Sequence, residues 1–542
     1  MNCKLKLLFV AVDEFDNSSK IVLRISNSVT MRNSRLLIDP AEIGKPGVLA
    51  DKLRNHGVKI PDGKEASRNF ISETIVKPMQ DCKEYAITDM TGWHAATNTF
   101  VLKCRTYGSA TMRPVHRARV LSATKPFVKE NSLERWKFEL GRLTRYSHSA
   151  VFAVSHALSG PLLARVLKIT DVPVVNLWSD TSSGKSSLLA IANTCFESPS
   201  SAADMPDFNQ TPRAREEELN SRNGLFMPVD EENLSEDLAS FVFNVASGKG
   251  RTRSRAVRDS LPNMKWVCAI LTSANRRAIE KGKEASPKGV RIVDLRIKRS
   301  EDGGVFEHGA KSLRAEDRNE ILNDCLEGCR KNSGSVGHHW LKLLTDSSLQ
   351  ADCFEIAARR REEFFGHYSV GLSGAQLRIL EKFANVYAAA TLAAKFELVP
   401  WTEENGHDSI IWCYERYMKQ NSGSYVDRKT VHHNLHRVVA EEDLFLRMNS
   451  DPTLASKRRA TTLGFMSTFK QRDTVCIWET DLMKLGKQVG CRGDALRSIL
   501  IDSGVLLKDA DGKHTILKAD PATGARSRFV AIDLKRLKAF IG

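Results

Sequence analysis

Long apolar runs, prolines and aromatic residues are all scarce in this sequence. Proline contributes 17 of the 542 residues and aromatic residues 7%, while 42% are hydrophobic and 27% are charged. A membrane-spanning helix needs about 18 consecutive apolar residues, but the best candidate, residues 384–394, is interrupted by Asn385 and Tyr387. The composition therefore argues against a mainly disordered chain, predicts packed cores, and leads us to expect no membrane span.

Paired cysteines and a targeting signal are also lacking. The 11 cysteines are odd in number and scattered, which is typical of reduced thiols in a cytoplasmic protein. The first apolar run, residues 7–12, is short and is closed by Asp13 and Glu14. It has neither the length nor the small-residue cleavage site of a signal peptide, so we expect it to form a strand.

One sign of charge is in excess. The chain has 81 lysines and arginines against 65 aspartates and glutamates, a formal net charge of +16. Such a surplus raises the local concentration of polyanions and favours nucleic acid as a partner. The alternative is that the charge only keeps the protein soluble.

The length exceeds what one hydrophobic core usually organises, and about 150 residues per domain predicts three or four domains. The sequence shows no internal repeat or low-complexity tract. Local patterns predict an N-terminal α+β domain at residues 1–115, an α/β core at 116–310, a helical domain at 311–450 and a winged-helix-like domain at 451–542.

Compact apolar runs in the core region alternate with helical segments. Residues 172–178 are typical of a buried strand, and strand-like runs recur at 225–229, 266–272 and 289–295. This alternation predicts a mainly parallel sheet with helices on both faces.

The C-terminal region changes character. We expect helices at 481–489 and 494–502, followed by strands at 505–508, 514–518 and 529–534, which is the order of a winged helix-turn-helix. The second helix would read nucleic acid, and the wing would carry Lys513, Lys518, Arg526 and Arg528. Residues 421–542 hold 21 lysines and arginines against 14 aspartates and glutamates, a surplus of 7 that favours DNA over an internal packing role.

The segment after the strand at 172–178 has the pattern of a phosphate-binding loop. Gly184, Lys185 and Ser186 follow a buried strand and open a helix, which is the context that such a loop requires. Backbone N–H groups would cradle the β-phosphate of ATP, Lys185 would reach the β- and γ-phosphates, and the hydroxyl of Ser186 would hold Mg²⁺. The pattern departs from its usual form at Ser179, where a glycine is expected. The nucleotide-binding residues of the loop are predicted to be Ser182, Ser183, Gly184, Lys185, Ser186 and Ser187.

A nucleotide site of this kind also needs carboxylates at the end of a second buried strand. The run 225–229 ends in Asp230, Glu231 and Glu232. Asp230 would face the metal and Glu231 would act as general base, with Glu232 as the substitute. Pro228 conflicts with a central strand because it removes a donor from the ladder. The alternative is that these acids only begin a solvated helix.

Polar and basic residues follow the remaining strands. Asn275 or Ser273, after the strand at 266–272, would sense the γ-phosphate, unless they only form a turn. Arg291, at the head of the strand at 289–295, would reach a neighbouring subunit's nucleotide, unless it is a surface arginine.

A glycine-rich loop would contact phosphate backbones or a neighbour's nucleotide, unless it is simply solvated. The cations of this loop are Lys249, Arg251, Arg253 and Arg255.

Over residues 91–300 the chain resembles the helicase-like P-loop ATPases of phages, satellites and integrative elements known as domain of unknown function nine-two-seven. The residues that carry the resemblance are Gly92, Trp93, Phe100, Trp136, Ser149, Pro161, Leu162, Leu163, Ser182, Ser183, Gly184, Lys185, Ser186, Thr211, Asp230, Glu231, Gly248, Lys249, Gly250, Arg251, Gly289 and Arg291. The sequence departs from the family at Ser179 and at residues 272–275. The resemblance implies a replicative helicase-type motor on mobile-element DNA and, together with Arg291, a homo-oligomeric ring such as a hexamer.

These observations predict an α/β protein built on an additional-strand, catalytic-glutamate P-loop ATPase core, with an N-terminal α+β domain, a helical region and a C-terminal winged helix. Its expected activity is ATP hydrolysis coupled to movement along, or unwinding of, single-stranded or forked DNA. The alternatives are an ATP-switched loader or assembly protein without unwinding activity, and a DNA-binding protein whose ATP site has decayed.

Overall fold

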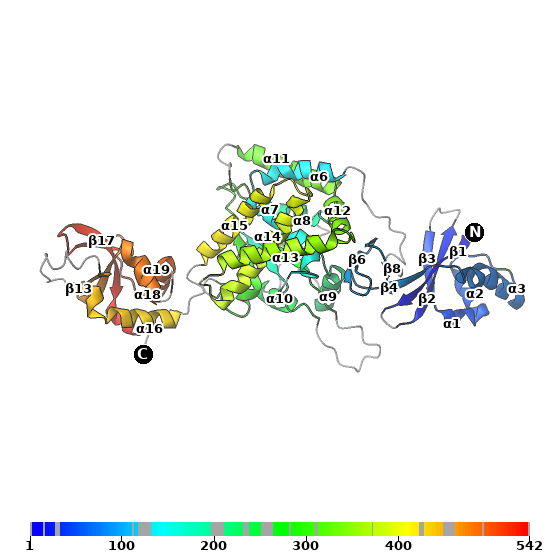
Figure 1. The fold of residues 1–542 in the computed structure, drawn as a ribbon, viewed down its shortest axis with the longest axis horizontal. Helices are drawn as coiled ribbons and strands as arrows, with labels where there is room; N and C mark the ends of the chain where they lie inside the picture. Colours follow the sequence, from blue (N-terminus) through cyan, green and yellow to red (C-terminus); the bar gives the residue numbers. More distant parts are fainter. Residues whose placement is uncertain are drawn as a thin grey trace. The chain divides into compact units, whose positions relative to one another are not determined.

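The computed structural model describes residues 3–14, 17–27, 33–110, 113–117, 132–167, 169–196, 211–230, 238–250, 264–280, 283–308, 313–370, 372–421, 428–447, 461–489, 491 and 493–539. The chain divides into two units, and each is described by itself (Figure 1). The larger unit comprises Met1–Ala278, Arg291–Val370 and Arg378–Glu415, and the smaller comprises Ile279–Val290, Gly371–Leu377 and Arg416–Gly542.

The larger unit begins with a mixed five-stranded sheet in the order β3-β2-β1-β4-β8. The strand predicted at residues 7–12 lies within β1, which runs antiparallel to β2 and parallel to β4. Leu7 and Leu23 of the sheet pack against Leu49 of α2 and Ile71 of α3, so one face of the sheet is covered by helices. The elements are β1 Cys3–Asp13, β2 Ser19–Asn27, β3 Asn33–Ile38, α1 Pro40–Ile43, α2 Pro46–Asn55, α3 Lys64–Ile71, a π-helical turn Ser72–Val76, α4 Lys77–Met79, β4 Glu84–Thr88 and β8 Arg113–His116.

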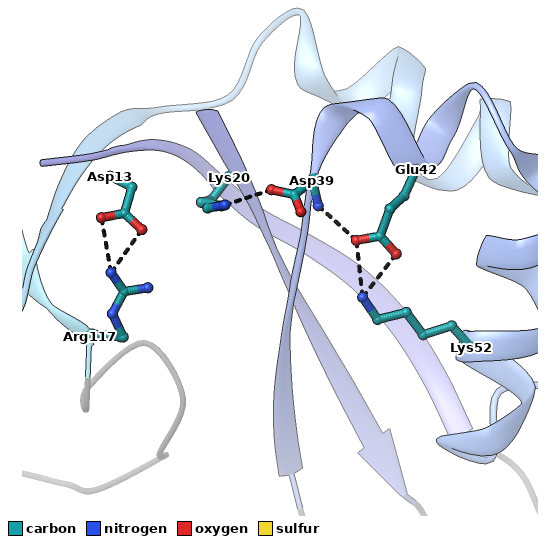
Figure 2. A network of polar contacts seen from close by, with 6 residues as sticks. All are labelled: Asp13, Lys20, Asp39, Glu42, Lys52 and Arg117. Atoms are coloured by element: carbon teal, nitrogen blue, oxygen red, sulfur yellow. Dashed lines mark hydrogen bonds and ion pairs between the residues drawn. The ribbon is translucent and has the colours of Figure 1, made fainter. Parts of the chain in front are cut away.

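One arginine ties together the carboxyl ends of three strands in this sheet. Arg117, just after β8, donates to both oxygens of Asp13 at the end of β1 (2.7 and 2.9 Å), as Figure 2 shows. It also donates to Asp89, which follows β4 (2.7 Å). Hydrogen bonds to Asp89 and Asp13 raise the pKa of Arg117 above its ordinary value. Since Asp13 is only 3% exposed, this pairing compensates a buried charge.

A second group of charges in Figure 2 fixes the start of the helical layer. Lys20 of β2 pairs with Asp39 (2.6 Å), the residue that caps α1. Glu42 accepts a hydrogen bond from the backbone N–H of Asp39 (2.9 Å) and pairs with Lys52 of α2 (2.9 Å). The sheet, α1 and α2 are therefore joined by one chain of polar contacts.

A small sheet in the order β5-β6-β7 joins this domain to the core of the same unit. Gly92 has a φ of 97°, and a Cβ there would lie 2.8 Å from the carbonyl oxygen of Asn223, so only glycine fits. Trp93 donates from Nε1 to the carbonyl of Pro161 (2.8 Å). The strands are β5 Gly92–His94, β6 Thr99–Val101 and β7 Thr106–Tyr107. Strands β6 and β7 are connected by a turn, in which Leu102 and Arg105 exchange backbone hydrogen bonds.

The core contains a four-stranded sheet in the order β10-β11-β9-β12, and every neighbouring pair is parallel. The strands are β9 Val174–Trp178, β10 Phe226–Asp230, β11 Ala269–Ala274 and β12 Ile292–Arg296. Their apolar runs are buried, as expected for a parallel sheet. The prediction of a parallel sheet is confirmed, and β11 lies between β9 and β10 although it follows both in the sequence.

The expectation that Pro228 occupies a central strand is wrong. Within the described part of the sheet, β10 pairs with β11 alone and forms an edge. An edge strand uses only alternate N–H groups for pairing, so it tolerates a proline that a central strand would not.

The described helices of this region are α6 Ser132–Thr144, α7 His148–Leu163, α8 Lys185–Asn193, α9 Pro212–Ser221 and α10 Leu238–Val245. Helix α7 is almost wholly buried and packs with α8 against β10 and β11. A Cβ at Gly160 would lie 2.6 Å from the carbonyl oxygen of Leu225, so glycine allows α7 to approach β10 closely. His156 of α7 donates from Nε2 to the carbonyl of Ile270 in β11 (3.0 Å).

The helical region predicted after residue 311 is confirmed. Its helices are α11 Ala315–Lys331, α12 Ser335–Leu344, α13 Gln350–Tyr368, α14 Gly374–Lys395 and α15 Glu403–Gln420. Trp340 of α12 donates to the carbonyl of Leu158 (3.0 Å) and so fixes α12 against α7. None of the helices in the described ranges has the length and apolar character needed to cross a membrane.

The smaller unit contains a five-stranded sheet in the order β13-β14-β15-β17-β16. The predicted helices at 481–489 and 494–502 are confirmed as α18 and α19, and Leu485 and Leu496 pack beneath the sheet. The strand predicted at 505–508 is wrong, because there only Leu506 forms an isolated bridge, with Ile532. The elements are α16 Arg428–Val439, β13 Phe445–Arg447, β14 Gly464–Phe469, β15 Arg472–Trp478, α18 Leu482–Val489, α19 Gly493–Asp502, β16 Ile516–Ala519, β17 Arg526–Asp533 and α20 Leu534–Ala539.

Candidate functional site

Three strands of the core sheet end at one cavity. Strands β9, β11 and β10 are parallel, so their carboxyl ends meet at the same edge of the sheet. The loop after β9, Asp230 of β10 and the residues that end β11 surround a cavity of about 720 Å³. Its lining residues are Thr181, Ser182, Ser183, Gly184, Lys185, Ser186, Ser187, Asp230, Ser273, Ala274, Asn275 and Arg276. All six predicted nucleotide-binding residues are among them, and so are Asp230, Ser273 and Asn275.

The loop between β9 and α8 has the backbone geometry that exposes a helix start. Ser182 has a φ of 60° and Gly184 a φ of 91°, both in the left-handed region. A Cβ at Gly184 would lie 2.9 Å from the side chain of Val305, so packing as well as backbone conformation requires glycine. Helix α8 begins at Lys185, and the first N–H groups of a helix have no partner within it. The cavity therefore faces a helix N-terminus, which favours an anion.

Ser179 fits the loop although the motif usually has glycine there. Its backbone is outside the positive-φ region that would require glycine. Its N–H donates to the carbonyl of Ala274 (3.2 Å), and its hydroxyl donates to the carbonyl of Lys298 (3.1 Å). The serine therefore anchors the loop between β11 and the segment after β12.

Lys185 points back along the loop. Its Nζ donates to the carbonyls of Asp180 (2.7 Å) and Ser179 (3.1 Å) and to the hydroxyl of Ser183 (3.2 Å). It also lies 3.4 Å from Oδ1 of Asn275. These described partners of the ammonium are neutral oxygens at the cavity wall, and phosphate oxygens would bind it more strongly.

Oxygen atoms from three elements meet beside Lys185. The hydroxyl of Ser186 donates to Oδ1 of Asp230 (3.2 Å), and the hydroxyl of Ser273 donates to the same oxygen. The two hydroxyl oxygens are 3.5 Å apart. This small cluster combines one carboxylate and two hydroxyl groups, which are the oxygen donors that Mg²⁺ prefers.

A buried polar row crosses the sheet behind the cavity. Thr272, Asn176 and Asp294 are register partners on β11, β9 and β12. Thr272 donates to Asn176 (3.0 Å), whose amide nitrogen donates to Asp294 (2.8 Å) and to the carbonyl of Arg276 (3.3 Å). Asp294 also accepts from the N–H of Ala278 (3.0 Å). The row therefore holds the segment after β11, which carries Asn275. The sequence analysis did not predict this polar row. The signals that could have indicated it are Asn176 and Asp294, each a polar residue inside an apolar run.

The segment after β12 supports the loop from the other side. The N–H of Val305 donates to the carbonyl of Ser183 (3.1 Å). Gly304 has a φ of 59°, and a Cβ at this position would collide with the same carbonyl oxygen. Arg299 pairs with Asp180 (3.3 Å), although both side chains are largely exposed. The loop is thus packed on both sides, which holds its cavity-facing surface in one conformation.

Arg291 lies away from this cavity. Arg291 precedes strand β12, which is parallel to β9 with Ile292 opposite Val174. It therefore lies at the amino ends of the strands, whereas the loop lies at their carboxyl ends. Its Nε is 3.5 Å from Asp171, and its guanidinium lies over the ring of Phe243 (4.5 Å). The fully buried Lys382 is close by, and burial lowers its pKa to about 8 while Asp171 raises it. Arg291 is therefore not among the described residues that line the cavity.

The basic loop is described only at its stem. The N–H of Gly250 donates to the carbonyl of Met264 (2.8 Å), and the N–H of Trp266 donates to the carbonyl of Gly248 (2.9 Å). The backbones of Lys249 and Lys265 form an isolated antiparallel β-bridge. Lys249 is exposed. The loop therefore rises from a β-hairpin stem. Arg251, Arg253 and Arg255 lie outside the described residues, as do Glu231 and Glu232 after β10.

The residues that line the cavity lie in an α/β core, at the carboxyl ends of the strands of its parallel sheet. Residues 11–259 match the family model described as Domain of unknown function (DUF927). This match confirms, over residues 11–259, the resemblance found in the sequence. The match begins within the N-terminal sheet, earlier than the motifs from Gly92 onward indicated.

A solved structure described as "SCCmec type IV Cch - active helicase" has a similar fold. The TM-score is 0.60 at 14% sequence identity, and the alignment covers 99% of this chain and 95% of that chain. At this identity the similarity concerns the fold. No curated protein matches the sequence.

Proposed function

We propose that the protein hydrolyses ATP at the cavity beside Lys185 and couples hydrolysis to movement along, or unwinding of, DNA of a mobile genetic element. The observation that carries the proposal is the convergence of Lys185, Ser186 and Asp230 on one cavity, at the carboxyl edge of a parallel sheet. The position of β11 between β9 and β10 supports an additional-strand ATPase core.

The loop residues would bind the phosphates. The helix N-terminus at Lys185 and the main chain of Ser182 to Ser187 would surround the β-phosphate. Lys185 would exchange its carbonyl partners for β- and γ-phosphate oxygens, where its charge stabilises the transition state more than the ground state. Asn275, held beside Lys185, would contact the γ-phosphate.

Mg²⁺ fits the oxygen cluster next to the loop. The hydroxyl of Ser186 would ligate it directly, while Asp230 would hold it from the second strand through water. Bound Mg²⁺ would neutralise phosphate charge during transfer. The hydroxyl of Ser273 orients the carboxylate of Asp230. Glu231, the next residue in the chain, would accept a proton from the attacking water, with Glu232 as the alternative base.

Several features support DNA as the partner. The net charge is +16, and Lys249 to Arg255 continue a hairpin stem that rises beside the core. The solved structure of similar fold is described as an active helicase. In the smaller unit, α18 and α19 followed by the β16-β17 hairpin support a winged helix. Arg291, remote from its own cavity, would reach the nucleotide of the next subunit in a ring.

An ATPase assay with and without single-stranded DNA tests this proposal. Turnover stimulated by DNA supports a motor. Slow turnover that DNA does not change supports the loader or assembly role, and no turnover at all supports a decayed site.

Replacement of Lys249, Arg251 and Arg253 by alanine refines the test. It should weaken DNA binding, flatten its salt dependence because fewer counterions are released, and abolish stimulation while basal hydrolysis survives. Loss of basal hydrolysis with unchanged DNA affinity would place these cations at the nucleotide and would withdraw the translocation role.

A further inference from the structure

The smaller unit has a cavity of its own, of about 570 Å³, far in sequence from the ATPase residues. Its wall combines the tip of the β14-β15 hairpin, the end of α19 and the chain that follows it, His514 just before β16, and the short helix α20. All of these segments belong to Arg416–Gly542, so the cavity lies within one unit.

Positive charge dominates this cavity. Its lining includes Lys470, Arg472, Lys508, His514 and Arg536, and no aspartate or glutamate is among its described lining residues. Arg472 and Arg536 are held by the buried Asp533 just behind the wall, at 3.1 and 3.6 Å. Arg536 also donates to the carbonyl of Gly504 (2.6 Å). Two guanidinium groups are thus fixed in place, and one carboxylate only partly offsets them.

The remaining two lysines are exposed and have no ion-pair partner in the described part of the chain. Lys508 lies just beyond Leu507, whose N–H bonds to the carbonyl of Ala531 in β17 (3.0 Å). Lys470 lies at the hairpin tip with its ammonium 5.5 Å from the ring of Phe469, which also lines the cavity. The cavity therefore presents two fixed and two adaptable cations next to an aromatic ring.

The hairpin tip carries backbone strain. Lys470 and Gln471 have φ values of 49° and 60°, and Phe469 pairs with Arg472, so these two residues form the whole turn. A turn with two positive φ angles strongly favours Asn-Gly, and neither residue here is a glycine or asparagine. Strained residues cluster at functional sites, and here one of the two, Lys470, lines the cavity.

Two of the four wing residues that the sequence suggested are held in contacts within the unit. Lys518 donates to Ser467 and to the carbonyl of Thr468 (2.5 Å), and Arg528 pairs with Asp509 (2.8 Å). These two cations hold the β16-β17 hairpin against the rest of the unit. The other two wing cations, Lys513 and Arg526, are exposed but do not line the cavity.

From this arrangement we infer that the cavity lined by Lys470, Arg472, Lys508 and Arg536 binds the phosphate backbone of nucleic acid, as a contact separate from the basic loop of the core. Guanidinium groups match the geometry of phosphate oxygens, and lysines add point charges. The ring of Phe469 offers an apolar surface to a sugar or base. The choice of nucleic acid as ligand rests on the proposed function, but the site requires no nucleotide turnover.

The test measures binding of fluorescent single-stranded and duplex DNA to the full-length protein without ATP, over a range of salt concentrations. The variant combines Lys470→Asn and Gln471→Gly, which supply the favoured turn, with Lys508→Ala. We expect at least 10-fold weaker binding and a salt dependence reduced by about two phosphate contacts, while basal ATP hydrolysis and the melting temperature are maintained. Lys470→Ala with Lys508→Ala, in the unmodified turn, should give the same loss of affinity.

The matched control removes two exposed cations outside the cavity, Lys513→Ala and Arg526→Ala. Unchanged DNA affinity in the cavity variant overturns the inference, and so does an equal loss in cavity and control variants, which would assign the effect to net charge. Loss of binding to an acidic peptide such as polyglutamate with DNA binding retained also overturns it. Because DNA binding is measured without ATP, an inactive ATPase would refute the proposed function and leave this inference standing.

Discussion

The hydroxyl of Ser186, on the first turn of α8, donates to the carboxylate of Asp230 at the end of β10 (3.2 Å). Helix α8 follows β9, and β9 and β10 are separated in the sheet by β11. The contact therefore depends on the order of the sheet rather than on neighbouring strands. Ser273, at the end of the intervening β11, completes the contact by donating to the same carboxylate.

We expect Lys185→Ala to lower the turnover of ATP by roughly 100-fold or more, because the lost ammonium leaves transition-state charge on the phosphates uncompensated. Steady-state hydrolysis measures the effect. Lys342→Ala, which removes an exposed lysine of α12, serves as the control and should leave turnover unchanged. Wild-type turnover in Lys185→Ala would mean that the cavity is not the hydrolytic site.

Glu231→Gln should retain ATP binding and stop hydrolysis, because glutamine keeps the shape of the side chain but cannot accept the proton of the attacking water. Binding of a fluorescent ATP analogue and release of phosphate measure the two effects separately. Glu232→Gln is the paired control. If it stops hydrolysis and Glu231→Gln does not, the general base is Glu232.

Ser273→Ala should raise the Mg²⁺ concentration needed for half-maximal hydrolysis by about 10-fold, because it removes the hydrogen bond that orients a metal-side carboxylate. Turnover at saturating Mg²⁺ should change much less. Thr181→Ala, at the same cavity but without a contact to Asp230, should leave the Mg²⁺ dependence unchanged. An equal loss of turnover at every Mg²⁺ concentration would contradict a role for Ser273 in positioning Asp230.

Low pH should destabilise the protein through His156. Burial lowers the pKa of this imidazole from 6.5 to about 4 in the folded state. As the pH falls below 6.5, the unfolded state takes up the proton first, so the stabilisation is complete above pH 6.5 and is lost progressively toward pH 4. Between pH 7 and pH 5 the free energy of unfolding should fall by about 2 kcal/mol on this account.

Chemical denaturation at pH 7 and pH 5 measures this loss. His156→Gln keeps a donor for the carbonyl of Ile270 but does not titrate, so its stability should depend less on pH than that of the wild type. His56→Gln, at the surface, should behave like the wild type. An unchanged pH dependence in His156→Gln would contradict the assignment.

Local patterns predicted the parts of the candidate site that follow one another along the chain. A buried strand, a turn and a helix start follow one another within a few residues around Gly184, Lys185 and Ser186. The sequence pattern alone therefore predicted this context. Sheet order is not local. Pro228 conflicts with a central strand but not with the edge strand that β10 forms in the described sheet. The polar row of Thr272, Asn176 and Asp294 exists because the registers of β11, β9 and β12 place these residues opposite one another.

The same limit applies to charged residues in the smaller unit. Lys518 and Arg528 were expected to face DNA because they decorate a wing. In the folded chain they reach Ser467 and Asp509, on segments distant in sequence. Lys470 and Arg472 lie on a hairpin that the sequence did not predict, since β14 and β15 gain their stability by pairing with each other and with β17. Charged residues can be counted from the sequence, but the residues that they contact in the folded chain cannot be identified from it.

Arg291 provides the most direct test of a ring, because its own cavity lies at the opposite edge of the sheet. If it stabilises the transition state in a neighbouring subunit, Arg291→Ala should bind ATP with nearly unchanged affinity and hydrolyse it slowly. Mixing this variant with Lys185→Ala should then restore activity at interfaces where an intact loop meets an intact arginine. Random mixing of equal amounts makes about a quarter of the interfaces competent.

The observed contacts of Arg291 define the control for this experiment. Arg291 lies next to Asp171 and over the ring of Phe243, so a purely structural arginine would stabilise its own subunit. Phe243→Ala, which removes the ring but keeps the guanidinium, should then lower stability as Arg291→Ala does. In the ring hypothesis, Phe243→Ala retains hydrolysis and only Arg291→Ala is rescued by mixing. A lower melting temperature in both variants, with no activity recovered on mixing, would make Arg291 a structural residue and would remove the argument for a subunit-bridging site.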